Sequence, residues 1–237
     1  MSARIDLYLA SSSPRRQQLL RQAHIPFELL VSSVDEEKLT AEYQGPIEEL
    51  GQYLATAKAL EARAELVKQE KWGRILAADT TVLLDGRSLA KPRDAFEAAS
   101  MLRQLRGRVH TVATGVALAE VNGCLLAATS TTEVQMRDFT DTEIERYVAT
   151  GDPLDKAGAY SIQHPDFEPV QAISGCRLGV VGLPICIVWG LMHPNQQLPA
   201  GETGWKRDIA GTCPWSSSCT PPYPAIATTQ SPPGSVS

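Results

Sequence analysis

The hydrophobic positions of this chain switch repeatedly between the period of two typical of a strand and the wider spacing typical of a helix. From the N-terminus they predict a strand over 5–10, a helix from 14 to about 24, a strand over 27–31 and a long helix from 46 to about 71. Strands that alternate with helices along the chain predict an α/β fold.

Turn and capping signals divide the rest of the chain. An apolar run that begins at 75 is expected to stop at Asp79, and the strand resumes over 82–84 before an Asp-Gly turn. An Asn-Gly pair joins two further strands, 109–120 and 124–136. Capping boxes start two helices, one at Asp94 with Glu97 and one at Thr140 with Glu143. A loop over 155–163 is expected to lead into a strand, and a strand-to-helix corner is expected over 179–184.

Composition excludes several classes of protein. With 237 residues, 43% hydrophobic and 21% charged, the chain is long enough for a sizeable core. Its net charge of -5 argues against a broad basic surface, so we expect no nucleic acid partner. The five cysteines lack C-x-x-C pairs, which argues against a zinc site and a disulfide framework. No apolar run approaches the roughly 18 residues of a membrane span and no signal peptide is seen, so we expect a cytoplasmic protein without membrane attachment.

The chain changes character after about Met192. Eight of its 16 prolines lie in 191–237, among Ser, Thr and Gly and without apolar periodicity. Such a segment cannot bury enough apolar surface to offset the entropy of ordering it. We therefore expect a folded domain over 1–192 and a mostly disordered tail over 193–237.

The strongest candidate for an anion site is the stretch SSSPRR, Ser11 to Arg16. Ser13 can cap a helix that has Pro14 at its first position, which leaves free backbone N–H groups beside two arginines. Arginines in a first turn oppose the helix dipole, at a cost of about 0.3 to 1 kcal/mol, unless an anion compensates. Phosphate is the obvious anion, and a capped helix with exposed arginines is the alternative.

Other polar groups are ambiguous when each is taken alone. Asp79 after an apolar strand suits a turn cap as well as a catalytic base or metal ligand. The acidic cluster 35–37 suits a solvated loop as well as Mg²⁺ ligation. Lys58 and Lys91 would each be read as surface lysines. No single group decides between these readings.

The order of the motifs is more specific than any one of them. Over roughly residues 5–190 the chain resembles the Maf family of nucleoside triphosphate pyrophosphatases. The motifs that carry this resemblance are SSSPRR, Glu36 after an apolar strand, LATAKA (54–59), AADT (77–80), AKPRD (90–94), GRVHTVATGVAL (107–118), DKAGAYSIQ (155–163) and VVGLP (180–184).

The resemblance implies a fold and a reaction. The fold would be an elongated α/β structure, similar to inosine triphosphatase, with a central mixed β-sheet flanked by helices and two lobes with a cleft between them. The reaction would be hydrolysis of a nucleoside triphosphate between its α and β phosphates, giving a monophosphate and pyrophosphate. A divalent cation, Mg²⁺ or Mn²⁺, would assist, and a homodimer is implied.

The resemblance also implies roles for the candidate residues. Asp79 would be the base that activates water, and Glu36 with Asp79 would hold the cation. Hydroxyl groups and four cations would bind the phosphates, since a polyanion needs several cations that converge on it. The residues with these phosphate roles are Ser11, Ser13, Arg15, Arg16, Lys58 and Lys91.

Three positions separate the subgroups of the family. Arg15, Thr80 and Gln163 match the subgroup that acts on dTTP and UTP, and an amide side chain such as that of Gln163 can both donate to and accept from a pyrimidine edge. The alternatives are a 7-methyl-GTP pyrophosphatase of the same family and a non-catalytic nucleotide-binding regulator of septum formation. The chain departs from the subgroup's usual glycines at Ser12, Ser161 and His164, which bears on base preference more than on the reaction.

Overall fold

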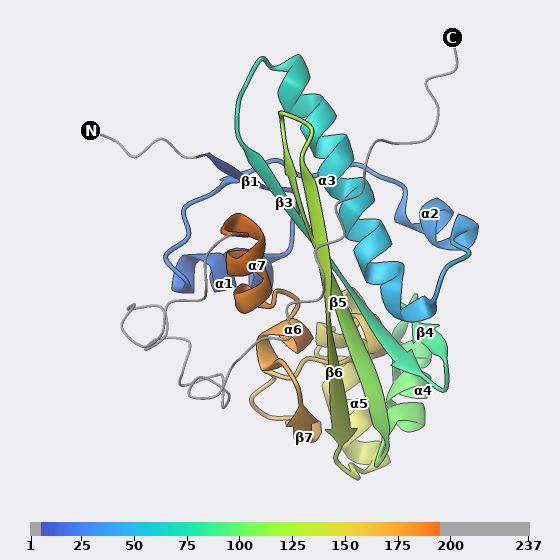
Figure 1. Ribbon diagram of the computed structural model, residues 1–237. Helices are drawn as coiled ribbons and strands as arrows, with labels where there is room; N and C mark the ends of the chain where they lie inside the picture. The colour runs from blue at the N-terminus through green and yellow to red at the C-terminus, as the bar shows by residue number, and fades with distance from the viewer. Residues whose placement is uncertain (1–5, 195–237) are drawn as a thin grey trace.

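The computed structural model describes residues 6–194, which form one mixed β-sheet with helices on both of its faces (Figure 1). The seven strands run in the order β2-β1-β3-β5-β6-β7, and β4 pairs with β3. β1 is parallel to β2 and β3, and the remaining pairs are antiparallel. The predicted α/β fold with a central mixed sheet flanked by helices is therefore confirmed.

Strands and helices are interspersed along the chain. The strands are β1 Leu7–Leu9, β2 Glu28–Leu29, β3 Arg74–Leu84, β4 Arg87–Leu89, β5 Val109–Glu120, β6 Leu125–Met136 and β7 Val170–Ser174. The α-helices are α1 Pro14–Gln22, α2 Glu36–Glu42, α3 Leu50–Lys68, α4 Ala95–Leu105, α5 Asp141–Ala149, α6 Arg177–Val181 and α7 Ile185–Met192. Short 3-10 helices are η1 Ile47–Glu49, η2 Asp152–Asp155 and η3 Ala157–Ala159.

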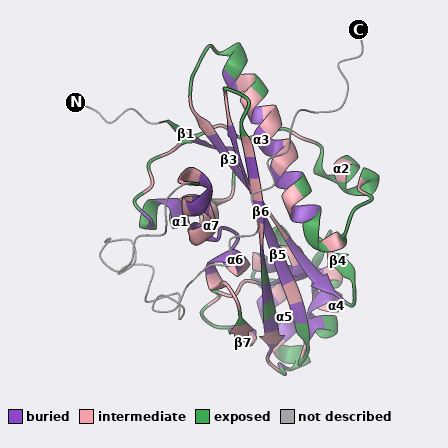
Figure 2. Ribbon diagram, viewed as in Figure 1, coloured by how far each residue is buried: buried purple, intermediate pink, exposed green. Residues whose placement is uncertain are grey.

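Three hydrophobic clusters share the long strands β3, β5 and β6. One packs α1, α6 and α7 on one face of the sheet, and a second packs α3 on the opposite face. The third lies at the other end of these strands and includes α4 and α5. β3 and β5 are accordingly buried over most of their length, whereas buried residues alternate with less buried ones along β6 (Figure 2). The molecule thus has two halves built on shared strands, and the cleft between them stays a prediction.

Small residues bring α3 unusually close to the sheet. Its buried face carries Ala55, Ala59 and Ala62 against alanines of β3 and β5. At the start of this helix, a Cβ added to Gly51 would lie 3.0 Å from the carbonyl oxygen of Asp79, and one added to Gly115 would collide with the backbone of Gln52. Lys58 lies two turns further along the same buried face, so this close approach places its side chain against the sheet.

The prediction that a strand stops at Asp79 is wrong. The strand does not stop at Asp79 but runs unbroken through it, with Asp79 paired to Gly115 of β5. The continuous pairing with β5 explains this, because β5 extends in both directions beyond Gly115, the residue that pairs with Asp79. Asp79 is therefore a mid-strand residue held on a rigid element, not a residue at a strand end.

Three further predictions change in detail. The strand expected over 27–31 is reduced to β2. The acidic cluster is not a loop, because Asp35 caps α2 and Glu36 opens it, as suits carboxylates at a helix N-terminus. The corner expected over 179–184 joins two helices, since Gly182 with φ of 121° ends α6 and α7 follows at once.

Turn and cap predictions are mostly confirmed. The Asn122-Gly123 turn joins β5 to β6, and Thr140 and Glu143 form a complete capping box. At α4 only half of the expected box forms: Asp94 accepts a hydrogen bond from the Glu97 amide, but the Glu97 carboxylate accepts from Arg93 instead.

A buried histidine makes folding sensitive to acid. His110 is 3% exposed, its Nε2 lies 2.8 Å from the Tyr160 hydroxyl oxygen, and its buried Nδ1 has no partner within residues 6–194. Burial lowers the pKa of His110 from 6.5 to about 4. Between these two values the unfolded chain binds a proton that the folded chain does not, so stability is present above pH 6.5 and is lost as the pH falls.

We expect the free energy of unfolding to drop by about 2 to 3 kcal/mol between pH 7 and pH 4.5 through this residue alone. Urea unfolding at both pH values would measure the drop. The matched variant His110→Gln keeps a polar partner for Tyr160 but does not titrate, so its drop should be smaller by that amount. Equal drops in the two proteins would contradict the assignment.

Two sequence predictions concern membranes and the tail. Within residues 6–194 no helix is long and apolar enough to cross a membrane. The tail expected over 193–237 lies outside the described residues from 195 onward.

Candidate functional site

The candidate site lies at an interruption in one edge of β3. On the side facing β1, pairing of β3 ends at Leu76, and pairing with β4 begins only at Val82. Within residues 6–194, positions 77–81 of β3 therefore have no strand partner on that edge. Asp79 and Thr80 lie in this stretch, and their side chains point to opposite faces of the sheet, because successive residues of a strand alternate.

On the α3 face of the sheet, one lysine joins two carboxylates. The Lys58 ammonium nitrogen lies 2.7 Å from Asp79 Oδ1 and 3.0 Å from Glu36 Oε1. Lys58 is 7% exposed, so it is not the surface lysine that its sequence context suggests when it is taken alone. The three predicted residues thus meet in one cluster with a formal charge of -1, which leaves it attractive to a further cation.

Polar contacts hold Glu36 in this cluster. α2 has no buried residue, as its colour in Figure 2 shows, so hydrophobic packing contributes little to its position. Ahead of it, the amide and hydroxyl of Ser33 donate to the two oxygens of Glu61 on α3, at 3.3 and 3.0 Å. α3 therefore holds the carboxylate of Glu36 through Lys58 and holds the preceding loop through Glu61.

On the opposite face of β3, the serine and arginine turn packs against Thr80. Ser13 caps α1 as predicted, with its hydroxyl accepting from the Arg16 amide. The Arg16 guanidinium donates to the Gly182 carbonyl at 2.9 Å, to Ser11 Oγ at 3.2 Å and to Thr80 Oγ1 at 3.4 Å. Arg16 is thus fixed by three partners, two of which are predicted site residues.

The electrostatics of Arg16 show that the two faces communicate. Burial lowers the pKa of Arg16, and the negative charge of Asp79 opposes this effect. The guanidinium stays protonated, since an arginine is not deprotonated in a protein. The predicted residues therefore form two clusters on either side of β3, one negative and one positive, and the charge of Asp79 acts on Arg16.

Thr80 is held by a directed chain of hydrogen bonds. Thr114 donates its hydroxyl to the Gly179 carbonyl at 2.8 Å. Its single proton is then used, so the 2.9 Å contact between the threonine hydroxyls is a bond donated by Thr80. Sequence reasoning did not single out Thr114.

Arg15 turns to a different partner from its neighbour. Its Nη1 lies 3.5 Å from Oδ2 of Asp155, and its side chain is 32% exposed. Asp155 belongs to the DKAG segment, one of the motifs that carry the family resemblance. The two adjacent arginines thus have distinct environments, Arg16 fixed against the protein and Arg15 more open to solvent.

The structure leaves the two remaining predicted residues exposed. Lys91 and Gln163 are on the surface, and their side chains are not joined to either cluster within the described residues. Their segments are nevertheless connected, because the Gly158 amide donates to the Ala90 carbonyl at 3.2 Å. A Cβ at Gly158 would lie 2.9 Å from Val82, so a glycine allows this turn to rest directly on β3.

The carboxylates fit the divalent cation that the sequence led us to expect. No group of three or more His, Cys, Asp or Glu side chains in residues 6–194 could hold a metal ion. Mg²⁺, however, commonly uses only one or two carboxylates and completes its shell with water and substrate phosphates. Glu36 and Asp79, held together by one lysine, provide such a pair.

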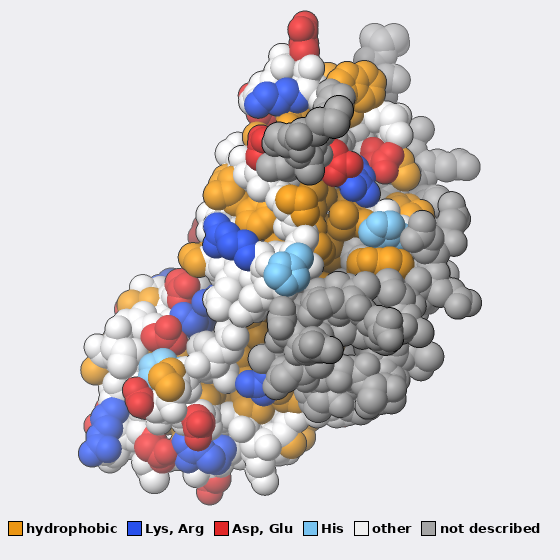
Figure 3. All heavy atoms as spheres, turned by 90° about the vertical axis from the view of Figure 1, so that its left-hand side faces the viewer, with side chains coloured by type: hydrophobic (Ala, Val, Ile, Leu, Met, Phe, Trp, Pro, Cys, Tyr) orange, Lys and Arg blue, Asp and Glu red, His pale blue; other side chains and the backbone are white. Residues whose placement is uncertain are grey.

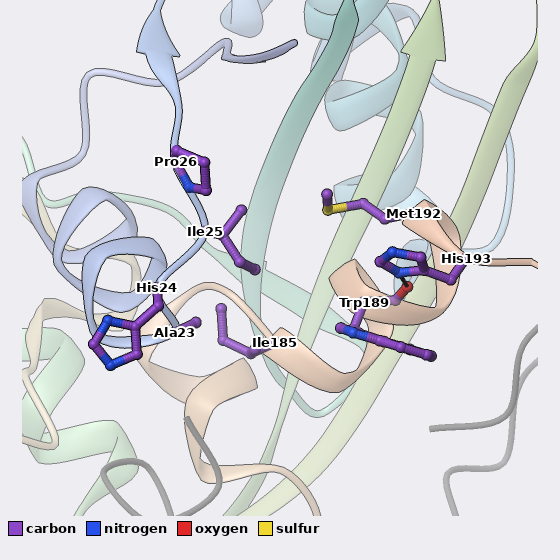
Figure 4. A pocket seen from close by; sticks show the side chains of 8 residues that line it. All are labelled: Ala23, His24, Ile25, Pro26, Ile185, Trp189, Met192 and His193. Atoms are coloured by element: carbon purple, nitrogen blue, oxygen red, sulfur yellow. Dashed lines mark hydrogen bonds between the residues drawn. The ribbon is translucent and has the colours of Figure 1, made fainter. Parts of the chain in front are cut away.

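A separate pocket of about 230 Å³ lies between the α1–β2 connection and α7 (Figure 4). Hydrophobic side chains gather on this face in the space-filling view from the α1 side (Figure 3). The lining contains no lysine, arginine or carboxylate, so it does not suit a triphosphate; it consists of Ala23, His24, Ile25, Pro26, Ile185, Trp189, Met192 and His193.

Arginines on one face of β3 and carboxylates on the other suit a polyanion that brings a divalent cation, which is the chemistry of a nucleoside triphosphate. The comparisons agree with this class. The family of Maf-like proteins matches residues 6–194, and this chain belongs to that family.

Curated relatives cover most of the chain. It is 44% identical over 190 residues to proteins named dTTP/UTP pyrophosphatase from Escherichia coli O157:H7 and from strain K12, covering 79% of this chain and 91% of each relative. A Shigella dysenteriae protein of the same name is 43% identical over the same length. Among solved structures, a nucleoside-triphosphatase (dITP/XTP pyrophosphatase) from Mycobacterium abscessus is similar with a TM-score of 0.35 and 18% identity, over 56% of this chain and 73% of that one.

Proposed function

We propose that this protein hydrolyses dTTP and UTP between the α and β phosphates, releasing pyrophosphate and a nucleoside monophosphate. The observation that carries the proposal is the ion cluster of Lys58, Asp79 and Glu36 beside an arginine-bearing turn, in a chain 44% identical to proteins named for this activity. A protein that only bound nucleotides would not need these paired carboxylates.

The two clusters divide the work of binding. Arg15 and Arg16 lie on the side of β3 where the serine turn offers hydroxyls and backbone N–H groups, and these groups bind the phosphates. Lys91 follows Ala90, whose carbonyl accepts from the Gly158 amide, and it adds a further cation for the phosphates. Glu36 and Asp79 would hold a divalent cation, and a bound cation would supply positive charge to the phosphates.

Asp79 is the base for the attacking water. Its Oδ1 is fixed by Lys58 at 2.7 Å on a continuous strand, so its carboxylate is held in one orientation before substrate binds. Phosphoryl transfer depends mainly on such positioning and on charge stabilisation. Asp79 accepts the proton of water as its oxygen attacks phosphorus.

Base choice rests on Arg15, Thr80 and Gln163. Gln163 is exposed, and its side-chain amide offers both a donor and an acceptor to a pyrimidine. Thr80 supports the choice indirectly, since its hydroxyl is engaged by Arg16 and Thr114.

Pyrophosphate release tests the proposal. We expect the full chain with Mg²⁺ to turn over dTTP and UTP with kcat/KM at least about tenfold above that for CTP or 7-methyl-GTP, a difference of about 1.4 kcal/mol. Turnover of none of the four would reject the enzyme, and a preference for 7-methyl-GTP would reject only the pyrimidine assignment.

A further inference from the structure

A second lysine, Lys156, lies buried beside the proposed site without being part of it. It is 7% exposed, and its ammonium group donates to the backbone carbonyl of Asp152 at 2.6 Å, to Oδ1 of the same residue at 2.9 Å and to Oδ1 of Asp155. An ammonium group has three N–H donors, and these acceptors use all of them. Lys156 is therefore fixed within the protein and has no donor left for a substrate.

One arm of this cluster leads to Arg15. The second oxygen of Asp155 lies 3.5 Å from Arg15 Nη1. Asp155 is 67% exposed at its side chain, and an exposed ion pair of this kind contributes little to stability. It can still fix direction, because Lys156 holds the other oxygen of the same carboxylate and so limits where the guanidinium points.

The other arm leads to Gln163. Tyr147 donates its hydroxyl to Asp152 Oδ2 at 2.6 Å and accepts from the Ser161 amide at 2.9 Å. Ser161 Oγ in turn accepts from the backbone N–H of Gln163 at 3.3 Å. Ser161 stands where the family subgroup usually has glycine, so its hydroxyl gives this chain a contact that glycine cannot make.

Packing keeps the middle of this arm in place. The Tyr147 ring stacks on Phe167 with centroids 4.3 Å apart, and His164 meets its edge at 4.8 Å. Burial raises the pKa of Tyr147, and the hydrogen bond to Asp152 raises it further, so the phenol stays protonated. Its single proton is then used by Asp152, while its oxygen accepts from the Ser161 backbone N–H.

We infer that Lys156 is a positioning residue that holds Arg15 and the Ser161–Gln163 segment in a fixed relation and so sets the nucleotide preference of the enzyme. The inference rests on the proposed function, in which Arg15 and Gln163 choose the base. It adds Asp155, Asp152 and Tyr147 as the residues through which Lys156 acts.

Asp155→Asn and Tyr147→Phe test the two arms separately. Each variant should raise KM for dTTP about five- to tenfold and change kcat less than twofold, because neither touches the cluster of Lys58 and Asp79. Each should also lower the selectivity ratio, which is kcat/KM for dTTP divided by kcat/KM for CTP, about fivefold. Asp141→Asn is the matched control, since it removes an exposed carboxylate that pairs with Arg103 and Arg106, and its KM and selectivity should equal those of the wild type.

Lys156 itself is tested by a pair of variants. Lys156→Arg keeps the positive charge and should retain at least half of the wild-type selectivity ratio. Lys156→Met removes the charge, and its selectivity ratio should fall as it does in the Asp155 and Tyr147 variants. If Lys156→Met fails to fold, the variants of Asp155 and Tyr147 still decide the question. Unchanged KM and selectivity in both of those folded variants would overturn the inference.

Amide hydrogen exchange separates this inference from the proposed function. In the free protein, Tyr147→Phe should speed exchange of the Ser161 amide at least about fivefold, whether or not any nucleotide is hydrolysed. A wild type that is inactive on all nucleotides would reject the proposed function while this measurement still tested the network. An unchanged exchange rate would reject the network even if dTTP were hydrolysed.

Discussion

Asp79→Asn is expected to lower kcat for dTTP about 1,000-fold or more, within the range that removal of a general base and a cation ligand commonly costs. Asparagine has the same shape as aspartate but cannot accept the proton of water. Lys58 keeps its contact with Glu36, so the fold should persist. Single-turnover pyrophosphate release would measure the rate, and calorimetric titration with dTTP should show that binding survives.

The control for this variant lies on the turn after the same strand. Asp85→Asn removes an exposed carboxylate, which pairs with Arg108 at 2.6 Å, and should leave kcat within twofold of wild type. A folded Asp79→Asn protein that kept more than a tenth of the wild-type rate would remove Asp79 from its role as base.

Gly115→Ala is expected to destabilise the protein by about 3 kcal/mol or more, because overpacking that displaces backbone costs more than a shift of flexible side chains. The added methyl group would collide with the backbone of Gln52, so α3 must move away from β5. That movement carries Lys58 away from Asp79, and kcat/KM should fall at least about tenfold. Urea unfolding and the pyrophosphate assay would measure the two effects.

A second glycine separates this clash from the general effect of losing a glycine. Gly86 lies in the β3–β4 turn with φ of 72° and has no atom within 4 Å of an added Cβ. Gly86→Ala should therefore cost only about 1 to 2 kcal/mol of backbone strain and leave activity unchanged. Equal losses of stability in the two variants would contradict the role given to the close approach of α3.

Features fixed by a few neighbouring residues could be predicted from the sequence. The Asn122-Gly123 turn, the Ser13 cap of α1 and the capping box at Thr140 are all present. Their physical causes are local, since the side chain and the backbone group that it satisfies lie within a few positions of each other. This is why the order of elements was predicted more reliably than their lengths.

Features that depend on distant segments could not be predicted in this way. Asp79 reads as a strand end because polar residues usually interrupt a buried strand, yet it lies inside one. A polar side chain is tolerated there because a distant segment supplies its partner, Lys58 of α3, and that partner is not visible near position 79. Asp79 and Thr80 point to opposite faces of β3, and this too depends on both residues lying inside the sheet.

The candidate site shows the same division. Lys58 has an ordinary helical context, and only the fold brings Glu36 and Asp79 to it. One signal was available and was not used: Gly115 stands alone inside a strand pattern, which often marks a close approach of another backbone. The roles assigned to the site residues by resemblance stay predictions until the variants are made.

The interruption at 77–81 has a consequence for how copies of the protein meet. A free strand edge ordinarily invites a strand of another molecule to add to it, which is a route to aggregation. Here the bare stretch is bounded by β1 at one end and β4 at the other, and the Arg16 side chain occupies one of its flanks. Within residues 6–194 an intruding strand could therefore pair over only about five residues, so the gap at which we propose that the nucleotide binds is too short to favour strand addition.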